Sequence, residues 1–324
     1  MSVYTRAAEL YAAGKSFGLF RHCWGKMTLI NHCTTQKDGT LVFGKYKVRP
    51  WPFDKKDKEY QTPPFTSTSH DEYISDISDL IASFGHSYDK TVIVRKIAGD
   101  MKVDLTNPEE FSARFEDYFK NFFVEYCYVF YTPETGLWFG ASPELLLHKF
   151  RDDRIKTQAL AGTRTLNSPW TAKDYLEHKI VVDDILSRIA PYAPAVQFER
   201  EVSHYGTVRH LLTRISVDCS RKDYSKVLKA LYPTPAICGF PREMAIENIR
   251  KYERFPRKFY TGILSFSDQQ YKQDYAVLRC AHVDGGKYEI FTGSGIIKDS
   301  DPESEWLETE AKAAPLIKFF SDNK

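Results

Sequence analysis

The spacing of apolar residues predicts two long helices in the middle of the chain. The first begins after the N-cap Asn107, with a proline in its first turn, and carries phenylalanines at helical spacing as far as Phe122. The second runs over residues 171–189, with an apolar stripe that includes Tyr175. Glu177 lies at the edge of this stripe, so the periodicity leaves open whether its side chain points inward or into solvent.

Alternating and aromatic-rich segments predict antiparallel strands. Residues 16–48 contain short strands broken at Gly25, and residues 126–139 predict a hairpin around a Pro-Glu-Thr-Gly turn. Strands and helices do not alternate as in a doubly wound parallel sheet, so the pattern favours the α+β class. Residues 49–66 hold four prolines and should form a loop, whose aromatic side chains favour packing against the body. We therefore expect a single domain over residues 1–324.

The composition indicates a globular protein and argues against several partners. The chain has 324 residues, 42% of them apolar, and its 45 basic and 43 acidic residues leave a formal charge of +2. Because there is no basic tract, nucleic acid is a poor candidate as a partner. The N-terminus lacks the apolar core of a signal peptide, and no segment approaches the ~20 apolar residues of a membrane span. We expect a cytoplasmic protein without a membrane partner.

Six cysteines and nine histidines lack the spacing of a zinc site or of a disulfide framework. Most of the cysteines should therefore be ordinary buried thiols. Any metal ion in this protein should be a hard ion, which carboxylates and other oxygen atoms bind.

Glu144 is a candidate proton donor. It follows the predicted hairpin and the sequence Gly-Ala-Ser-Pro, and three leucines come directly after it. A carboxyl group in such apolar surroundings is partly desolvated, which raises its pKa and suits it to giving up a proton near pH 7. The alternative is a turn carboxylate that accepts a hydrogen bond from a backbone N–H group, and the residues alone leave both readings open.

Three charged residues near the C-terminus form a candidate site for a cation and an anion. Asp301 is a good N-cap and a proline follows it, so a helix should begin there. Spacings of three and four residues place Glu305, Glu308 and Lys312 on one face of that helix. The patch follows a glycine turn at residues 292–295, whose bare backbone could approach an anion closely. The alternative is a solvated Glu–Lys pair on the helix surface.

Six segments together resemble the successive signatures of the chorismate-utilising enzymes. They are FGASPELL at residues 139–146, LAGTR at 160–164, KDYLEH at 173–178, PTPAICGFP at 233–241, GSGI at 293–296 and DPESEWLETEAK at 301–312. KTVIVR at 90–95 resembles the strand that precedes them, whereas the first 80 residues match loosely and look abbreviated. The resemblance implies an α/β sandwich of two large, mostly antiparallel sheets flanked by helices. Its catalytic core, residues 81–324, would bind chorismate and Mg²⁺.

The resemblance also implies roles for the carboxylates and for the lysine near the C-terminus. Glu177 and Glu308 match the metal-binding glutamates of the family, and Glu305 matches an acid that would reach the metal through water. Lys312 matches a lysine that pairs with a carboxylate of the substrate. Mg²⁺ is a hard ion that few carboxylates bind while it retains several waters, and this ligand set agrees with that preference.

Positions that match substrate-contacting residues of the family come from several segments. They are Ala161, Gly162, Thr163, His210, Tyr260, Arg279, Gly293, Gly295 and Lys312. His210 stands beside leucines, so it could equally be a core histidine whose hydrogen bonds are satisfied. Arg279 could bind a carboxylate of chorismate through two hydrogen bonds. The chain departs from the family pattern at Tyr175, where the family has an arginine.

Lys90 and Ala161 separate the activities within the family. Isochorismate and salicylate synthases use a lysine to activate water, and Lys90 aligns with that lysine. Burial and the nearby Arg95 would lower its pKa from the usual ~10.4, as this role requires. Aminodeoxychorismate synthases often carry a lysine where this chain has Ala161, which argues against an amine-forming enzyme. We therefore expect no glutamine amidotransferase partner.

The segment at 234–241 resembles the isochorismate synthase version of its signature, so the resemblance implies that activity. Lys90 would activate a water that attacks C2 of chorismate, Glu144 would protonate the departing C4 hydroxyl group, and Mg²⁺ would anchor the ring carboxylate. The alternatives are a salicylate synthase, an anthranilate or aminodeoxychorismate synthase component I, and a non-catalytic binding subunit. The choice between menaquinone and siderophore synthesis stays open.

Overall fold

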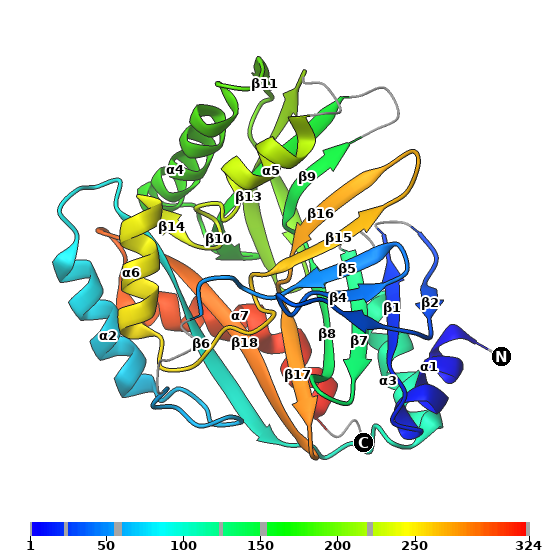
Figure 1. The fold of residues 1–324 in the computed structure, drawn as a ribbon. Coiled ribbons are helices and arrows are strands. Elements are labelled where there is room, and N and C mark those ends of the chain that lie inside the picture. The colour runs from blue at the N-terminus through cyan, green and yellow to red at the C-terminus, as the bar shows by residue number, and fades with distance from the viewer. Residues whose placement is uncertain are drawn as a thin grey trace.

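Two antiparallel sheets form the framework of the protein (Figure 1). The structure is a computed structural model, and it describes residues 2–22, 25–54, 60–122, 126–149, 154–218 and 223–321. The eight-stranded sheet contains, in spatial order, β14 (Gly239–Phe240), β6 (Lys90–Asp100), β18 (Lys287–Ile297), β17 (Cys280–Asp284), β8 (Gly136–Ser142), β7 (Tyr126–Thr132), β1 (Phe17–Arg21) and β2 (Thr28–Ile30). The ten-stranded sheet contains β11 (Ala195–Gln197), β13 (Val208–Val217), β10 (Ile155–Thr165), β9 (Leu145–Lys149), β16 (Lys272–Ala276), β15 (Ile263–Ser267), β5 (Tyr46–Arg49), β4 (Leu41–Phe43) and β3 (Thr34–Thr35), with β12 (Glu201–Tyr205) paired to β13.

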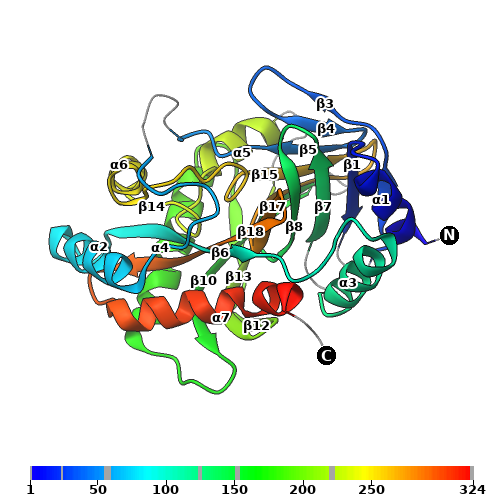
Figure 2. The same cartoon turned by 90° about the horizontal axis from the view of Figure 1, so that it is seen from below.

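Helices cover the outer faces of both sheets. They are α1 (Val3–Ala12), α2 (His70–Ser83), α3 (Pro108–Lys120), α4 (Ala172–Ile189), α5 (Tyr224–Leu231), α6 (Arg242–Tyr252) and α7 (Pro302–Phe320). α1, α3 and α7 pack on the eight-stranded sheet with α2 beside α7 (Figure 2), whereas α4 and α5 cover the ten-stranded sheet. The predicted α+β class, with two large antiparallel sheets flanked by helices, is confirmed.

The aromatic strand β7 serves two cores at once. Tyr126, Tyr128 and Phe130 pack between the two sheets, whereas Cys127 and Val129 belong to the core under α1 and α3. Successive side chains point to opposite faces of a strand, and both faces of β7 are covered, so the segment is buried almost throughout. This is why the sequence reads as a continuous apolar run there rather than as an alternation.

The predicted helix starts are confirmed by their caps. Oδ1 of Asn107 accepts hydrogen bonds from the backbone N–H groups of Glu109 and Glu110 at 2.9 and 3.2 Å, and α3 begins directly after it. Asp301 caps α7 in the same way, because its Oδ1 accepts from the N–H group of Ser304 at 2.9 Å. Each cap satisfies donors that the first turn of a helix leaves unpaired.

Helix α4 buries most of the apolar stripe that the pattern indicated, but Tyr175 is not part of the buried face. Tyr175 is 38% exposed, whereas Val181 is fully buried together with Glu177 and His178. The prediction that Tyr175 belongs to the buried stripe is therefore wrong. Polar residues occupy part of the buried face because they have partners there: both ring nitrogens of His178, for example, are hydrogen-bonded.

The loop between β5 and α2 packs against the body, as expected from its aromatic residues. Trp51 is 3% exposed, and the ring of Phe65 stacks on His282 of β17 with ring centroids 5.2 Å apart. Residues 55–59 of this loop lie outside the described part. Covering these rings removes apolar surface from water, which stabilises the loop without regular secondary structure.

The cysteine prediction holds for the thiols that the structure describes. Cys127, Cys238 and Cys280 are buried and unbridged, and Cys33 is partly exposed; Cys23 and Cys219 lie outside the described residues. Within the described ranges, the helices are too short or too polar to cross a membrane.

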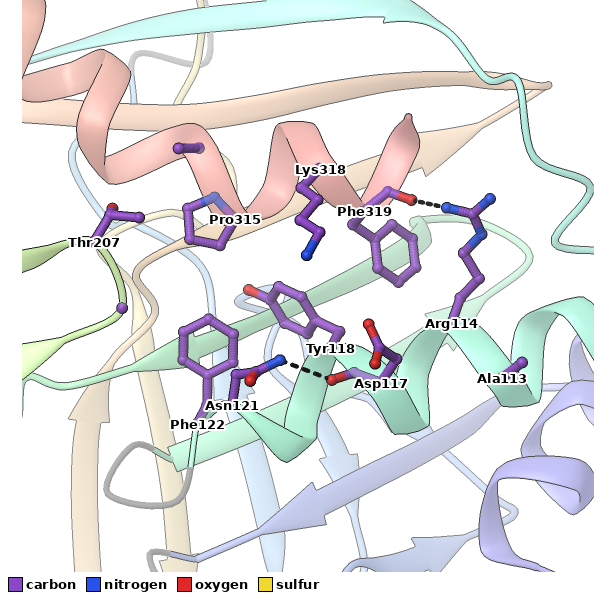
Figure 3. Close-up of a pocket in the computed structure, with 12 residues that line it drawn as sticks. Ala113, Arg114, Asp117, Tyr118, Asn121, Phe122, Thr207, Pro315, Lys318 and Phe319 are labelled. Carbon is purple, nitrogen blue, oxygen red and sulfur yellow. Dashed lines mark hydrogen bonds between the residues drawn. The ribbon is translucent and has the colours of Figure 1, made fainter. Parts of the chain in front are cut away.

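Pro315 interrupts the hydrogen-bond ladder of α7 beside the groove in Figure 3. A proline has no N–H group, so the carbonyl of Ala311, four residues earlier, loses its helical donor. The hydroxyl group of Thr207, on the turn between β12 and β13, donates to that carbonyl at 2.5 Å. The groove, about 740 Å³ in volume, lies between α7 and α3, and Arg114 of α3 donates to the carbonyl of Phe319 at 2.8 Å.

Candidate active site

Most of the predicted site residues line one small cavity between the two sheets. The cavity has a volume of about 60 Å³, and both sheets, α4 and α7 contribute to its wall. The predicted residues that line it are Glu144, Ala161, Thr163, Glu177, His210, Tyr260, Arg279, Gly293, Gly295 and Lys312. Signatures that are far apart in the sequence therefore meet at one place in the fold.

Lys90 forms a buried ion pair with Glu177, which lines the cavity, although Lys90 itself is not among the lining residues. Lys90 is the first residue of β6, and its Nζ lies 3.0 Å from Oε1 of Glu177 on α4. Their side chains are 1% and 6% exposed. Burial lowers the pKa of Lys90, and the Glu177 carboxylate opposes this shift only in part. A lysine with a lowered pKa can be present as the neutral amine, the only form in which a lysine can accept a proton as a general base.

Gly295 makes this close approach possible. A Cβ atom at Gly295 would lie 2.3 Å from Oε1 of Glu177 and 2.8 Å from Cε of Lys90. The prediction of a glycine turn at residues 292–295 is wrong, because these residues continue β18, which pairs with β6 along its whole length. Glycine in a strand can mark a close approach instead of a turn, and here it makes room for buried charges.

Glu144 has a carboxyl oxygen without a partner. It lies in the connection between β8 and β9 and is 2% exposed. Among the described residues, nothing hydrogen-bonds to its buried Oε1. Burial raises the pKa of Glu144 to about 8, although the positive charge of Lys90 lowers it in part. The carboxyl group is therefore mostly protonated at neutral pH and can act as an acid.

Lys173 links two of the three glutamates that were expected to bind metal. Its Nζ lies 3.0 Å from Oε2 of Glu177 and 2.8 Å from Oε1 of Glu305. Burial alone would lower the pKa of Lys173, but the carboxylates of Glu177, Glu305 and Glu308 raise it well above its usual value. Oε2 of Glu305 is buried, and no partner for it occurs in the described part of the chain. Burial raises the pKa of Glu305, and this rise survives the opposing charge of Lys173.

Glu308 and Lys312 form the pair that their spacing predicted, but not on an exposed surface. Nζ of Lys312 lies 2.6 Å from Oε1 of Glu308 and donates to the carbonyl of Gly293 at 2.9 Å. The side chains of Glu308 and Lys312 are only 11% and 15% exposed. Within the described ranges, no three His, Cys, Asp or Glu side chains converge as a ready set of metal ligands. The glutamates face ammonium groups instead.

His210 is both a satisfied buried histidine and part of the cavity wall. A guanidinium group can only donate, so Nε2 of His210 accepts from Arg279 at 2.9 Å, and Nδ1 carries the proton beside the Thr163 hydroxyl at 3.0 Å. Burial, and then the charge of Arg279, hold the pKa of His210 well below its usual range. Gly162 adopts a φ of +73° at an irregularity in β10 between Ala161 and Thr163.

Two residues contact the site although the sequence analysis gave them no role. Lys173 stands four residues before Glu177, and this i,i+4 spacing on a helix was the available signal. Tyr73 of α2 is buried and shares a 2.8 Å hydrogen bond with Ser294 of β18. Nothing local in the sequence connects Tyr73 with Ser294, because the fold alone brings them together.

Comparison with known proteins places these residues in a family. A family model described as chorismate binding enzyme matches residues 33–321. The chain is 32% identical over 273 residues to the vibriobactin-specific isochorismate synthase of Vibrio cholerae, covering 78% of this chain and 67% of that protein. It is 33% identical over 206 residues to isochorismate synthase MenF of Escherichia coli, covering 59% of this chain and 47% of MenF. The matched part thus spans about half to two thirds of these relatives.

The fold agrees with a solved member of the same group. The structure of MenF, the menaquinone-specific isochorismate synthase from Escherichia coli, superimposes with a TM-score of 0.77 at 19% identity. The superposition covers 99% of this chain and 92% of that chain. At this identity the likeness concerns the fold alone, whereas the sequence matches extend to the segments that line the cavity. The chain therefore belongs to the family of chorismate binding enzymes.

Proposed function

We propose that this protein is a Mg²⁺-dependent isochorismate synthase, and that residues 1–324 act as one chorismate-binding domain. The observation that carries the proposal is a pair of buried groups, Lys90 and Glu144, whose pKa values are shifted in opposite directions; Glu144 lines the cavity, and Lys90 is paired with the cavity residue Glu177. An enzyme that moves a hydroxyl group needs a base for the incoming water and an acid for the departing hydroxyl. The isochorismate synthases among the sequence relatives support the same assignment.

In this mechanism Lys90 and Glu144 move the protons. Lys90, as the neutral amine, takes a proton from a water molecule while the water oxygen forms a bond to C2 of chorismate. Both conjugated double bonds of the ring shift, from C1=C2 to C1=C6 and from C5=C6 to C4=C5, as the bond from C4 to its hydroxyl group breaks. Glu144 donates its proton to that hydroxyl group, which leaves as water. Lys90 ends protonated and Glu144 ends ionised, so Lys90 must release a proton and Glu144 must take one up before the next turnover.

Two cationic side chains in the cavity wall suit the two carboxylates of chorismate. Lys312 lies on α7, and Arg279 precedes β17 and is held by neutral His210. An arginine can bind a carboxylate with two parallel hydrogen bonds, whereas a lysine binds it as a point charge. Ala161, Gly293 and Tyr260 also line the cavity. Chorismate is the partner in this proposal, without an amidotransferase subunit.

The glutamates on α4 and α7 suit a hard divalent cation. Oε2 of Glu305 is a buried oxygen without a partner among the described side chains, which is a position that a cation could satisfy. Glu308 and Glu177 both raise the pKa of Glu305, so the three carboxylates lie close enough to repel one another. Glu177, Glu305 and Glu308 would hold Mg²⁺ here. The ion would supply positive charge for the ring carboxylate of chorismate.

The test is incubation of the purified protein with chorismate and Mg²⁺, with the products separated by chromatography. We expect conversion to isochorismate until an equilibrium mixture is reached, without release of pyruvate and without dependence on ammonium. Stoichiometric pyruvate together with salicylate would reject the assignment in favour of a salicylate synthase. An aminated product that required ammonium would reject the role of Lys90 as a base for water.

A further inference from the structure

Both carboxylate oxygens of Glu177 are paired with lysines. Oε1 lies 3.0 Å from Nζ of Lys90, and Oε2 lies 3.0 Å from Nζ of Lys173. A divalent cation bound to this carboxylate would come close to an ammonium group in a site with little water. Like charges repel strongly there, so one of the two lysines has to leave Glu177 when such a cation binds.

Lys90 has little room to leave. Its side chain is 1% exposed, and its Cε packs so closely on the backbone of β18 that a Cβ atom at Gly295 would be only 2.8 Å away. Lys173 differs in both respects. Its side chain is 13% exposed, and it lines a second pocket of about 570 Å³. Lys173 is therefore the residue that can give way.

The second pocket offers a place for a displaced ammonium group. Its wall includes Asp299 and Asp301 at the start of α7, together with Lys173 and Glu305. An ammonium group that moves out of the glutamate cluster can thus stay near negative charge while it gains solvent. The pocket and the first turn of α4 meet at Lys173, so the exchange needs a change of side-chain rotamer and no movement of the helix.

We propose that Lys173 holds the place of the divalent cation and exchanges with it. In this view the ammonium group of Lys173 leaves Glu177 and Glu305 when the cation binds them, and moves into the pocket beside Asp299 and Asp301. The proposal rests on the proposed function, because it takes these glutamates as the cation ligands. Lys173 is then a positioning residue, which keeps the carboxylates of α4 and α7 together and ionised until the cation replaces it.

Charge balance in the cluster points the same way. Three carboxylates, those of Glu177, Glu305 and Glu308, face three lysines, Lys90, Lys173 and Lys312. The cluster is neutral when all six groups are ionised, and it carries one negative charge when Lys90 is the neutral amine of the proposed mechanism. A divalent cation that entered without displacing a lysine would leave an excess of positive charge in a buried place in either case. Release of Lys173 to the second pocket reduces that excess.

Chemical labelling of lysines in the wild-type protein tests the exchange directly. Lysines are modified by reductive methylation at increasing Mg²⁺ concentration and quantified by mass spectrometry, and calorimetry measures Mg²⁺ binding to the same protein. We expect Lys173 to be protected without Mg²⁺ and to become reactive severalfold faster as Mg²⁺ saturates the site. Lys179, on the same helix and 57% exposed, should react at all Mg²⁺ concentrations and serves as the internal control.

The possible outcomes separate this proposal from the proposed function. Mg²⁺ binding by calorimetry without any change at Lys173 would overturn the exchange and leave the Mg²⁺ dependence standing. Absence of any Mg²⁺ binding would overturn both. A rise in Lys173 labelling that is half-maximal at the calorimetric Kd supports both, since two independent processes would not share one midpoint.

A matched pair of variants gives a second readout. Lys173→Met removes the competing charge, so it should tighten Mg²⁺ binding by about tenfold or more, within the usual range for coupled ligands. Without Mg²⁺, the Tm of Lys173→Met should lie below that of the wild type. Addition of Mg²⁺ should raise the Tm of the variant by more than it raises the Tm of the wild type. Lys179→Met should leave Mg²⁺ binding unchanged. Equal or weaker Mg²⁺ binding by Lys173→Met would contradict the proposal.

Discussion

Two buried clusters of charge lie along the same pair of strands, β6 and β18, and they differ in whether their carboxylates are satisfied. In the first, Glu289 is surrounded by donors. Its Oε1 accepts from Lys258 at 2.9 Å and lies 3.0 Å from Nδ1 of His282, and its Oε2 accepts from Lys96 at 3.0 Å and from the N–H group of Phe65 at 3.1 Å. We call this set the Glu289 cluster.

The second set, which we call the site cluster, contains Lys90, Lys173, Glu144, Glu177 and Glu305. Here Oε1 of Glu144 and Oε2 of Glu305 are buried, and neither has a partner in the described part of the chain. The pKa shifts follow the same division. Burial would raise the pKa of Glu289, but His282 and the two lysines lower it strongly, whereas the pKa of Glu144 rises to about 8.

The contrast distinguishes charged groups that stabilise the fold from charged groups that take part in the reaction. A buried carboxylate with a full set of donors holds segments together, and the Glu289 cluster attaches the loop before α2 to β17 and β18. A buried carboxyl group without partners costs stability, so its presence calls for a function that compensates. The two clusters should therefore respond in opposite ways to substitution.

The largest expected effect is on turnover at the site cluster. Lys90→Ala and Glu144→Ala should each lower kcat by about 10²- to 10⁴-fold, the usual size of a general acid–base contribution, with little change in KM. Lys96→Ala is the matched control, because Lys96 is also a buried lysine of β6. Its kcat per folded molecule should stay near the wild-type value. Retention of more than about half of the wild-type rate by either site variant would show that its assigned role is wrong.

The reverse pattern is expected at the Glu289 cluster. Glu289→Gln removes the charge between Lys96, Lys258 and His282, and breaking a buried pair on one side typically costs about 3 to 5 kcal/mol. Denaturant unfolding should show this loss, whereas kcat/KM per folded molecule should change little. A stable Glu289→Gln variant with greatly reduced turnover would place this cluster in the catalytic machinery and remove the distinction.

Much of this arrangement could be predicted from the sequence, and the failures have a physical cause. The caps at Asn107 and Asp301 are local, so α3 and α7 begin where expected. By contrast, contacts between distant parts of the chain decide which residues of α4 face inward and whether residues 292–295 form a turn or a strand. Apolar spacing misplaced Tyr175, because buried polar residues such as Glu177 hold part of the inner face.

Residues 292–295 looked like a turn for a related reason. Two glycines two residues apart are common in turns. Only the pairing of β18 with β6 shows that a side chain at Gly295 would collide with Glu177. Lys173 went without a role for the same reason, since its partner Glu305 comes from another helix. Long-range contacts of this kind leave no periodic signal in one sequence.

A smaller effect is expected in how the buried Glu144 carboxyl group changes the free energy of unfolding with pH. In the folded protein its pKa is about 8, above the ordinary value of 4.5. A raised pKa contributes stability that is fully present below the unfolded pKa and is lost as pH rises toward the folded one. The wild type should therefore lose stability relative to Glu144→Gln between about pH 4.5 and pH 8, by up to a few kcal/mol, since one pKa unit corresponds to about 1.4 kcal/mol.

Denaturant unfolding of both proteins at pH 5 and at pH 8.5 measures this difference. Glu247→Gln, on the exposed side of α6, is the control and should track the wild type at both pH values. An equal gap between wild type and Glu144→Gln at the two pH values would mean that the Glu144 carboxyl group is not held protonated by burial.

The smallest effect is expected for a single hydrogen bond to α7 that lies outside both clusters. Thr207→Val removes the donor to the carbonyl of Ala311 and should lower stability by about 1 kcal/mol, the typical worth of one hydrogen bond. In a Pro315→Ala background the backbone N–H at position 315 can donate to that carbonyl, so Thr207→Val should cost clearly less. Identical losses in the two backgrounds, measured by thermal unfolding, would mean that Thr207 does not compensate for the proline.

The pH dependence of kcat/KM is the sharpest test of Lys90 as the base and Glu144 as the acid, because it reports the pKa values of these groups in the free enzyme. With neutral Lys90 as the base and protonated Glu144 as the acid, kcat/KM should rise with pH as Lys90 loses its proton. It should then fall above about pH 8 as Glu144 ionises. Glu289→Gln should show the same profile, because the Glu289 cluster takes no part in proton transfer. A rate that stays level or keeps rising from pH 8 to pH 10 would contradict the account, since an ionised Glu144 has no proton to donate.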